Sequence, residues 1–241
     1  MIFAAGLGTR LKPLTDTMPK ALVPLNGKPL LQWQVEKLRD AGITDIVVNV
    51  HHFPDQIIDA IRTNSGWGCN ISVSDERDEL LDTGGGLRKA MTIHHTPYTI
   101  HRTPVLACNV DILSNIDLRA LIAAYEQTGE SQLVVSDRPT QRYLCFDEQA
   151  HLCGWTNIAT GEVKGSDGQH LAFSGMQILH PDVLRLLDDM PANKFSLIDF
   201  YLHFLPVLKA YIPTNYKMMD VGKFEQLNVA ERFAEQIKYS I

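Results

Sequence analysis

The sequence predicts an α/β fold with a Rossmann-like, mainly parallel mixed sheet that carries helices on both faces. Through the first half of the 241 residues, short runs rich in β-branched residues alternate with stretches of helical periodicity. Parallel strands that are buried on both faces typically read as continuous apolar runs, as these do. Ligands of such sheets bind at the carboxyl ends of the strands, and here a glycine-containing loop directly follows the first run.

The first half contains five predicted strands separated by predicted helices. The strands are expected at 2–5, 44–50, 69–75, 104–110 and 131–137. The helices are expected at 29–42, 53–62, 83–91 and 117–129. Proline near the start and glycine at the end bound the first helix, which places Leu31, Val35 and Leu38 on one face. This βαβα order is typical of a parallel sheet.

The second half is less regular. Residues 142–155 indicate a hairpin with Asp147 and Glu148 in its turn, and 170–179 indicate a strand with a glycine inside it. Helices are expected at 181–187, 195–210 and 223–237, and a final buried strand at 217–221. There is no repeat or clear linker, so one domain over 1–241 is expected.

Composition limits the function classes. The chain is 45% hydrophobic and 21% charged with a net charge of −6, so no overall basic field favours nucleic acid or an anionic membrane. No apolar run approaches the roughly 20 residues that span a bilayer, and no signal-peptide pattern opens the chain. The four cysteines show no C-x-x-C zinc spacing and no disulfide framework. A soluble, cytoplasmic protein is expected, while a start upstream of Met1 stays open.

The loop after the first strand combines glycine with positive charge. The dinucleotide fingerprint G-x-G-x-x-G is excluded because its third glycine would fall at Leu11, and no P-loop string occurs. A long loop that Pro13 and Pro19 keep extended can wrap a triphosphate with its N–H groups, while nearby cations neutralise the charge. The alternative is a turn whose glycines only relieve strain. The cations of this segment are Arg10, Lys12, Lys20 and Lys28.

The stretch from Ala4 to Leu25 resembles the signature loop of the sugar-1-phosphate nucleotidyltransferases, which form nucleoside-diphosphate sugars. D-T-G-G-G, N-V-D, F-S-G and M-D-V-G follow in the family's order, at 82–86, 109–111, 173–175 and 219–222. The chain is most similar to the short N-acetylmuramate-1-phosphate uridylyltransferases of cell-wall recycling. The resemblance implies a GT-A-like nucleotidyltransferase fold with a nucleotide-binding half at about 1–137 and a sugar-binding half at about 138–241.

The resemblance also implies a Mg²⁺ site at Asp111 and Asp220. Taken alone, each aspartate reads as a turn or cap residue after a strand. Arg10 is expected to hold the departing phosphates, and Lys20 to bridge the α-phosphate and the sugar phosphate. Many relatives have glycine where this chain has Val110, so a side chain is expected near the ribose or the metal.

Two binding pockets follow from the resemblance. The nucleotide pocket is expected to contain Ala4, Ala5, Gly6, Gly8, Thr9, Asp82, Thr83, Gly84 and Asn109. The sugar pocket is expected to contain Asn157, Ser174 and Gly175. Near Asn157 the chain lacks the lysine with which many relatives meet the sugar phosphate, and Arg142 or Lys164 is a candidate substitute. The histidine pairs at 51–52 and 94–95 support no metal geometry.

The expected substrates are a nucleoside triphosphate and a sugar 1-phosphate, with UTP and N-acetylmuramic acid 1-phosphate favoured. Guanylyl or thymidylyl transfer to another sugar 1-phosphate, such as mannose 1-phosphate, stays open. A non-catalytic regulatory subunit that binds sugar nucleotides is a further alternative, against which the retained loop cations and aspartates argue. A monomer or a homodimer is expected.

Overall fold

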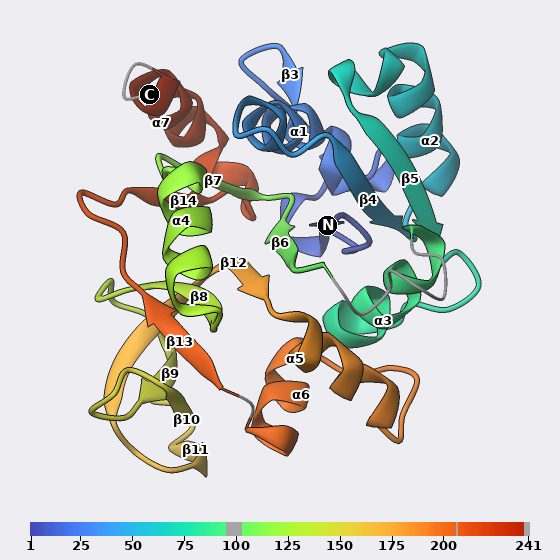
Figure 1. Ribbon diagram of the computed structural model, residues 1–241. Coiled ribbons are helices and arrows are strands. Elements are labelled where there is room, and N and C mark those ends of the chain that lie inside the picture. The colour runs from blue at the N-terminus through green and yellow to red at the C-terminus, as the bar shows by residue number, and fades with distance from the viewer. Residues whose placement is uncertain (95–102, 206, 239–241) are drawn as a thin grey trace.

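The computed structural model describes residues 1–94, 103–205 and 207–238 (Figure 1). The strands of its main sheet are β1 Ile2–Phe3, β4 Asp45–Val50, β5 Asn70–Asp75, β6 Val105–Asn109, β8 Ser131–Ser136, β9 Arg142–Phe146, β10 Leu152–Asn157, β11 Glu162–Gly165, β12 Gln169–Leu179 and β13 Leu208–Tyr211. Their order is β11-β10-β9-β12-β6-β1-β4-β5; outside this order β8 pairs with β12, and β13 pairs with β8. Strands β6, β1, β4 and β5 are parallel, whereas β12 is antiparallel to β6, β8 and β9. The predicted mixed sheet is confirmed.

Helices cover both faces of this sheet, as predicted. They are α1 Leu30–Asp40, α2 Pro54–Thr63, α3 Asp82–His94, α4 Leu118–Thr128, α5 Pro181–Arg185, α6 Leu197–Phe204 and α7 Leu227–Lys238. Val48 of β4 belongs to the core that contains Leu31 of α1 and Ile57 of α2. The adjacent Val47 belongs to a second core, with Leu87 of α3 and Phe200 of α6. Successive strand residues point to opposite faces, so the two cores lie on opposite sides of the sheet.

None of the helices in the described part of the chain has the length and apolar character needed to cross a membrane.

The helix predicted over 195–210 is wrong in its second half. Helix α6 ends at Phe204, Leu205 takes the left-handed conformation with φ 42°, and Leu208–Tyr211 forms strand β13, parallel to β8. Leu205 precedes a proline in the sequence, and a residue in that position disfavours the helical conformation. The short run Leu208–Tyr211 fits a buried strand as well as a helix. Position 206 lies outside the described residues.

The final strand is also placed differently from the prediction. Strand β14 Met218–Asp220 is half-buried, and it pairs with β7 Ile112–Ser114 in a separate two-stranded sheet. Strands β2 Pro24–Leu25 and β3 Lys28–Pro29 form another small sheet. The prediction of a final strand is therefore confirmed. The prediction that this strand is buried is wrong, because it pairs with β7 beside the main sheet.

The loop after β1 is not extended, contrary to the prediction. It folds into three short 3₁₀ turns, Thr9–Leu11, Leu14–Asp16 and Lys20–Leu22. Prolines directly precede the second and third turns, where the fixed proline φ suits a helical start. The hydroxyl of Thr15 donates to the carbonyl of Gly8 at 2.8 Å, which closes the loop on itself.

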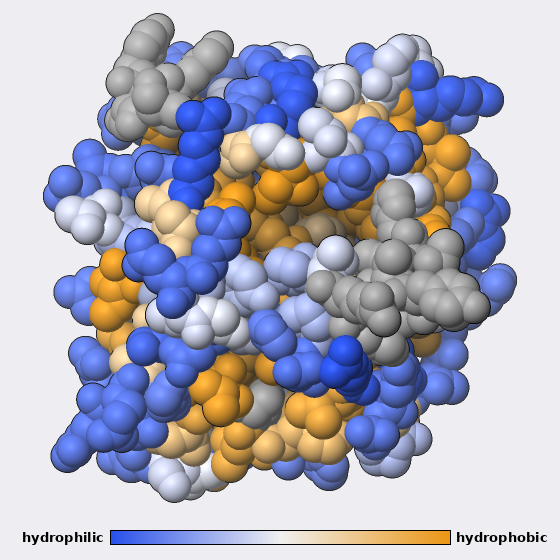
Figure 2. All heavy atoms as spheres, viewed as in Figure 1, coloured by the Kyte–Doolittle hydropathy of each residue, from blue (hydrophilic) through white to orange (hydrophobic). Residues whose placement is uncertain are grey.

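An apolar cavity of about 650 Å³ opens at the amino-terminal ends of the parallel strands. Strand β1 lies between β4 and β6 and has only two residues, Ile2 and Phe3. At the amino-terminal end of the described sheet, no strand residue separates β4 from β6. The buried Met1 amino group donates to the carbonyl of Leu106 at 2.6 Å, and burial lowers its pKa. Figure 2 shows the apolar hollow near the centre of the view. The cavity lies at the opposite sheet edge from the glycine loop.

Candidate functional site

The two predicted metal-binding aspartates lie side by side at the carboxyl edge of the parallel strands. Asp111 comes two residues after the end of β6, and Asp220 pairs with the next residue, Ile112, across the small β14–β7 sheet. The Val221 N–H donates to the Asp111 carbonyl at 2.8 Å. This pairing brings together two residues that are far apart in the chain.

Each of these aspartates forms an ion pair with one of the two predicted catalytic cations. The Lys20 ammonium contacts the Asp111 carboxylate, and the two side chains are only 13% and 12% exposed. Arg10 lies 3.7 Å from the Asp220 carboxylate in a more open position, with side chains 57% and 48% exposed. The structure therefore gathers Arg10, Lys20, Asp111 and Asp220 into one cluster.

The electrostatics of this cluster suit a divalent cation. Burial and then the negative charge of Asp111 raise the pKa of Asp220, while Lys20 and Arg10 act in the opposite direction. Two carboxylates held this close repel each other, and a cation bound between them removes the repulsion. Carboxylate oxygens are also the protein ligands that Mg²⁺ prefers. The donor set is thus compatible with Mg²⁺.

The F-S-G segment forms a bulge in β12 next to this cluster. The pairing of β12 with β8 is irregular between Phe173 and Gln177, and Gly175 has φ +69°. A Cβ atom at Gly175 would lie 2.8 Å from the amide nitrogen of Asn109, so glycine permits this close approach. The Ser174 side chain is fully buried. Predicted nucleotide and sugar residues therefore meet at Asn109 and Gly175.

The Val110 side chain lies in the protein interior. It is 3% exposed and packs in the core with Ile2 and Leu113. That it lies near the ribose or the metal stays a prediction.

A buried polar network holds the start of the glycine loop. The Ala4 N–H donates to Asn49 Oδ1 at 2.7 Å, and Asn49 Nδ2 donates to Glu76 Oε1 at 2.8 Å. Glu76 Oε2 accepts the N–H of Leu81 at 3.0 Å. No role for Asn49 or Glu76 was predicted from the sequence. Asn49 is a polar residue near the end of β4, and Glu76 is an acidic residue directly after β5, and both positions could have indicated a site. Because its N–H is used here, Ala4 does not offer it to a ligand.

The predicted residues at the start of α3 are bound to the segment before α6. The N–H of Gly84 donates to the carbonyl of Phe195 at 2.9 Å, and the N–H of Leu197 donates to the Thr83 hydroxyl at 3.0 Å. Asp82 takes φ +62° and accepts the N–H of Thr83 at 2.6 Å. This helix start is therefore anchored to the half of the chain that is predicted to bind the sugar.

The remaining predicted sugar residue, Asn157, lies at the end of β10. Its Oδ1 accepts the N–H of Ala159 at 3.1 Å, and it pairs across the sheet with Arg142. Lys164 lies 3.4 Å from the Asp199 carboxylate, with its ammonium 5.5 Å from the centre of the Trp155 ring. None of these contacts joins Arg142 or Lys164, the candidate substitutes for the missing lysine, to the aspartate cluster.

The ring nitrogens of the first histidine pair contact backbone carbonyls. His51 Nδ1 lies 2.7 Å from the carbonyl of Glu76, and His52 Nε2 lies 3.0 Å from that of Thr15. The second pair extends to position 95, outside the described residues.

Comparisons with known proteins show the family of the chain. Residues 1–145 match the model of the family described as nucleotidyl transferase. The N-acetylmuramate alpha-1-phosphate uridylyltransferase of Caulobacter vibrioides is 40% identical over 83% of this chain and 81% of its own length. The enzyme of that name from Neisseria meningitidis serogroup B is 35% identical over 76% of this chain and 75% of its own.

A solved structure covers nearly the whole fold. HddC from Yersinia pseudotuberculosis, complexed with GMP-PN, superposes with a TM-score of 0.76 at 27% identity, over 96% of this chain and 97% of its own.

Proposed function

The chain belongs to the nucleotidyl transferase family as a sugar-1-phosphate nucleotidyltransferase, and we propose that it makes UDP-N-acetylmuramic acid from UTP and N-acetylmuramic acid 1-phosphate. The observation that carries the reaction type is the cluster in which Lys20 pairs with Asp111 and Arg10 pairs with Asp220. The choice of base and sugar is supported by the two uridylyltransferase relatives. Such an enzyme belongs to cell-wall recycling in the cytoplasm.

The proposed reaction is an in-line displacement. An oxygen of the sugar phosphate attacks the α-phosphorus of UTP, the bond to the β-phosphate oxygen breaks, and pyrophosphate leaves. The attacking monoester has a second pKa near 6, as a phosphorylated side chain does, so it is mostly a dianion at about pH 7. Because the nucleophile carries no proton to remove, the protein needs no general base. Catalysis then depends on positioning and charge stabilisation.

The cations of the cluster supply that stabilisation. Lys20 begins the third turn of the loop and contacts Asp111, the proposed metal ligand, and its ammonium would contact the α-phosphate and the sugar phosphate. Arg10 is more exposed and can bind the leaving pyrophosphate. Asp111 and Asp220 would hold Mg²⁺, which supplies further neutralisation of phosphate charge.

A substrate panel tests this proposal. UTP, GTP, dTTP, ATP and CTP are each combined with N-acetylmuramic acid, N-acetylglucosamine, mannose and glucose 1-phosphates, and pyrophosphate release is measured. We expect the highest kcat/KM with UTP and N-acetylmuramic acid 1-phosphate. A higher value with another pair would overturn the substrate assignment, and no release with any pair would overturn the activity.

Guanylyl transfer is the second candidate, because the solved structure of HddC contains GMP-PN. GTP giving the highest kcat/KM in the same panel would favour it.

A further inference from the structure

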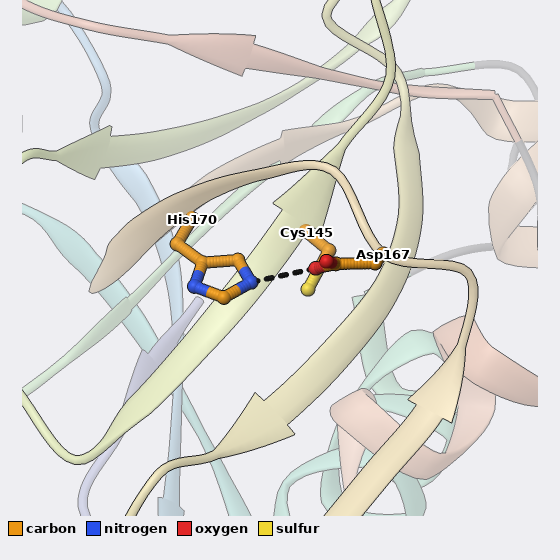
Figure 3. Close-up of side chains that lie close together, drawn as sticks. All are labelled: Cys145, Asp167 and His170. Atoms are coloured by element: carbon orange, nitrogen blue, oxygen red, sulfur yellow. Dashed lines mark hydrogen bonds and ion pairs between the residues drawn. The ribbon is translucent and has the colours of Figure 1, made fainter.

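A second group of metal-binding side chains lies outside the aspartate cluster, in the antiparallel part of the sheet. It consists of Cys145 on β9, Asp167 in the connection from β11 to β12, and His170 on β12 (Figure 3). One sulfur, one carboxylate oxygen and one ring nitrogen from these residues all lie within 4.8 Å of one another. None of these residues has a role in the proposed reaction.

The register of the sheet builds this group. His170 pairs directly with Cys145 between antiparallel β12 and β9, so both side chains lie on the same face. The ring of Tyr143, two residues before Cys145, stacks on the His170 ring with centroids 5.7 Å apart and planes at 20°. Asp167 Oδ1 lies 2.7 Å from His170 Nε2. The imidazole is thus held in position from two sides.

A second thiol lies under the same connection. The Cys153 sulfur contacts the carbonyls of Cys145, Ser166 and Asp167 at 3.3, 3.6 and 3.6 Å. Cys145 itself is fully buried, whereas the Asp167 and His170 side chains are 81% and 40% exposed. The group therefore combines an anchored sulfur with two ligands that a cation can reach from solvent.

We propose that Cys145, Asp167 and His170 form a zinc-type metal site, distinct from the Mg²⁺ site assigned to the aspartates. Thiolate, imidazole and carboxylate are the protein ligands of Zn²⁺, whereas Mg²⁺ takes oxygen ligands. Bond lengths of about 2.0–2.3 Å place the ligand atoms of a tetrahedral zinc site roughly 3.3–3.8 Å apart. Asp167 Oδ1 and His170 Nε2, which lie 2.7 Å apart, therefore need to separate slightly. The Cys145 sulfur, which lies within 4.8 Å of both ligand groups, needs to approach by up to about 1 Å. When the Zn–S bond forms, the thiol proton passes to solvent, and water completes the coordination.

Bound metal would link β9 to β12 and to the connection that crosses them. A cation that binds only the folded state stabilises that state by mass action. The alternative to a metal site is an exposed histidine–aspartate ion pair beside a buried cysteine, and such a pair would hold no metal.

Cobalt binding tests the proposal without relying on enzyme activity. The full chain is stripped of metal with a chelator, kept reduced, and titrated with Co²⁺ in excess Mg²⁺, which occupies the aspartate site. We expect one equivalent of Co²⁺ to produce a thiolate-to-cobalt charge-transfer absorption that Zn²⁺ abolishes by displacement. No such absorption in the wild-type chain would overturn the proposal.

Three variants assign the ligands. Cys145→Ser should lose the charge-transfer absorption, and His170→Gln, at an exposed position, should weaken Co²⁺ binding by at least about 10-fold. Cys69→Ser changes a partly exposed thiol outside this group and is the control, with both properties expected to persist. Circular dichroism checks that each variant is folded. Absorption that survives in Cys145→Ser, or Co²⁺ affinity unchanged in His170→Gln, would contradict the assignment.

Discussion

The ammonium of Lys20 forms an ion pair with the carboxylate of Asp111, and both side chains are nearly buried. One residue is the predicted phosphate ligand and the other the predicted metal ligand. In the absence of substrate, each therefore neutralises the other. Arg10 and Asp220 repeat this pairing in a more exposed position. We propose that binding of metal and triphosphate exchanges these partners, and that the carboxylates would then hold the metal while the cations would contact phosphate.

Lys20→Met tests this exchange. We expect kcat/KM to fall by about 100-fold or more, because a charge contact to the transition state is lost. Affinity for Mn²⁺ in the absence of nucleotide should rise, since Asp111 is freed from its competitor. Pyrophosphate release and calorimetric Mn²⁺ titration provide the two readouts.

Lys209→Met is the matched control, because it also removes a lysine from an ion pair. Lys209 lies on the distant strand β13, and its ammonium is 3.2 Å from the Glu130 carboxylate. Unchanged or weaker Mn²⁺ binding in Lys20→Met would argue against competition between the lysine and the metal.

Asp111→Asn separates the metal role of this residue from its structural role. We expect turnover to be lost and Mn²⁺ affinity to fall, because the amide keeps the shape but not the charge of a metal ligand. The unfolding midpoint should stay close to the wild-type value. Turnover at the wild-type rate would show that Asp111 is not a ligand of a required metal.

Gly222→Ala should disturb the more exposed ion pair. An added Cβ would lie 2.5 Å from the Asp220 carboxylate and 2.7 Å from the Arg10 guanidinium, so both groups must move. We expect kcat/KM to fall by at least about 10-fold, since small displacements of positioning groups are costly. Steady-state kinetics with a parallel urea denaturation measures this effect. A variant that is destabilised but kinetically normal would contradict it.

Glu76→Gln should weaken the network that holds the glycine loop. The glutamate accepts hydrogen bonds from Asn49 and Leu81, and the glutamine has one acceptor oxygen in place of two. An unsatisfied buried polar group costs about 1–3 kcal/mol, and we expect the free energy of unfolding to fall by that amount. Urea denaturation measures it. Glu79→Gln, at an exposed neighbouring position, should leave stability unchanged, and an equal loss there would rule out the network as the cause.

Lys37 should make stability depend on alkaline pH. Its ammonium donates to the carbonyl and hydroxyl of Ser114 at 2.7 Å, and burial lowers its pKa from 10.5 to about 8. Between these values the unfolded state binds more protons, so stability should rise with pH from about 8 to 10.5. Buried thiols and tyrosines act in the opposite direction, so the comparison is with Lys37→Met. The difference between the two proteins should change across this window, and parallel curves would exclude Lys37 as the source.

Much of the parallel half of the fold could be predicted from the sequence. Strands such as Asp45–Val50 and helices such as Leu30–Asp40 have local periodicity and clear end signals, and both occur where expected. The run at 208–211 was predicted as helix because its apolar spacing suits either structure. Its parallel pairing with β8 decides for a strand, and a local pattern does not encode that pairing.

The sequence by itself determined the family and predicted the roles of the glycine loop and the two aspartates, because these reside in contiguous motifs. Only the tertiary structure decided that Lys20 neutralises Asp111, that Asn49 and Glu76 hold Ala4, and that Cys145 faces His170. The physical reason is that sheet register and loop closure join residues that are distant in the chain. The cysteines lack zinc spacing in the sequence, and Cys145 and His170 come together only because β9 and β12 pair in that register.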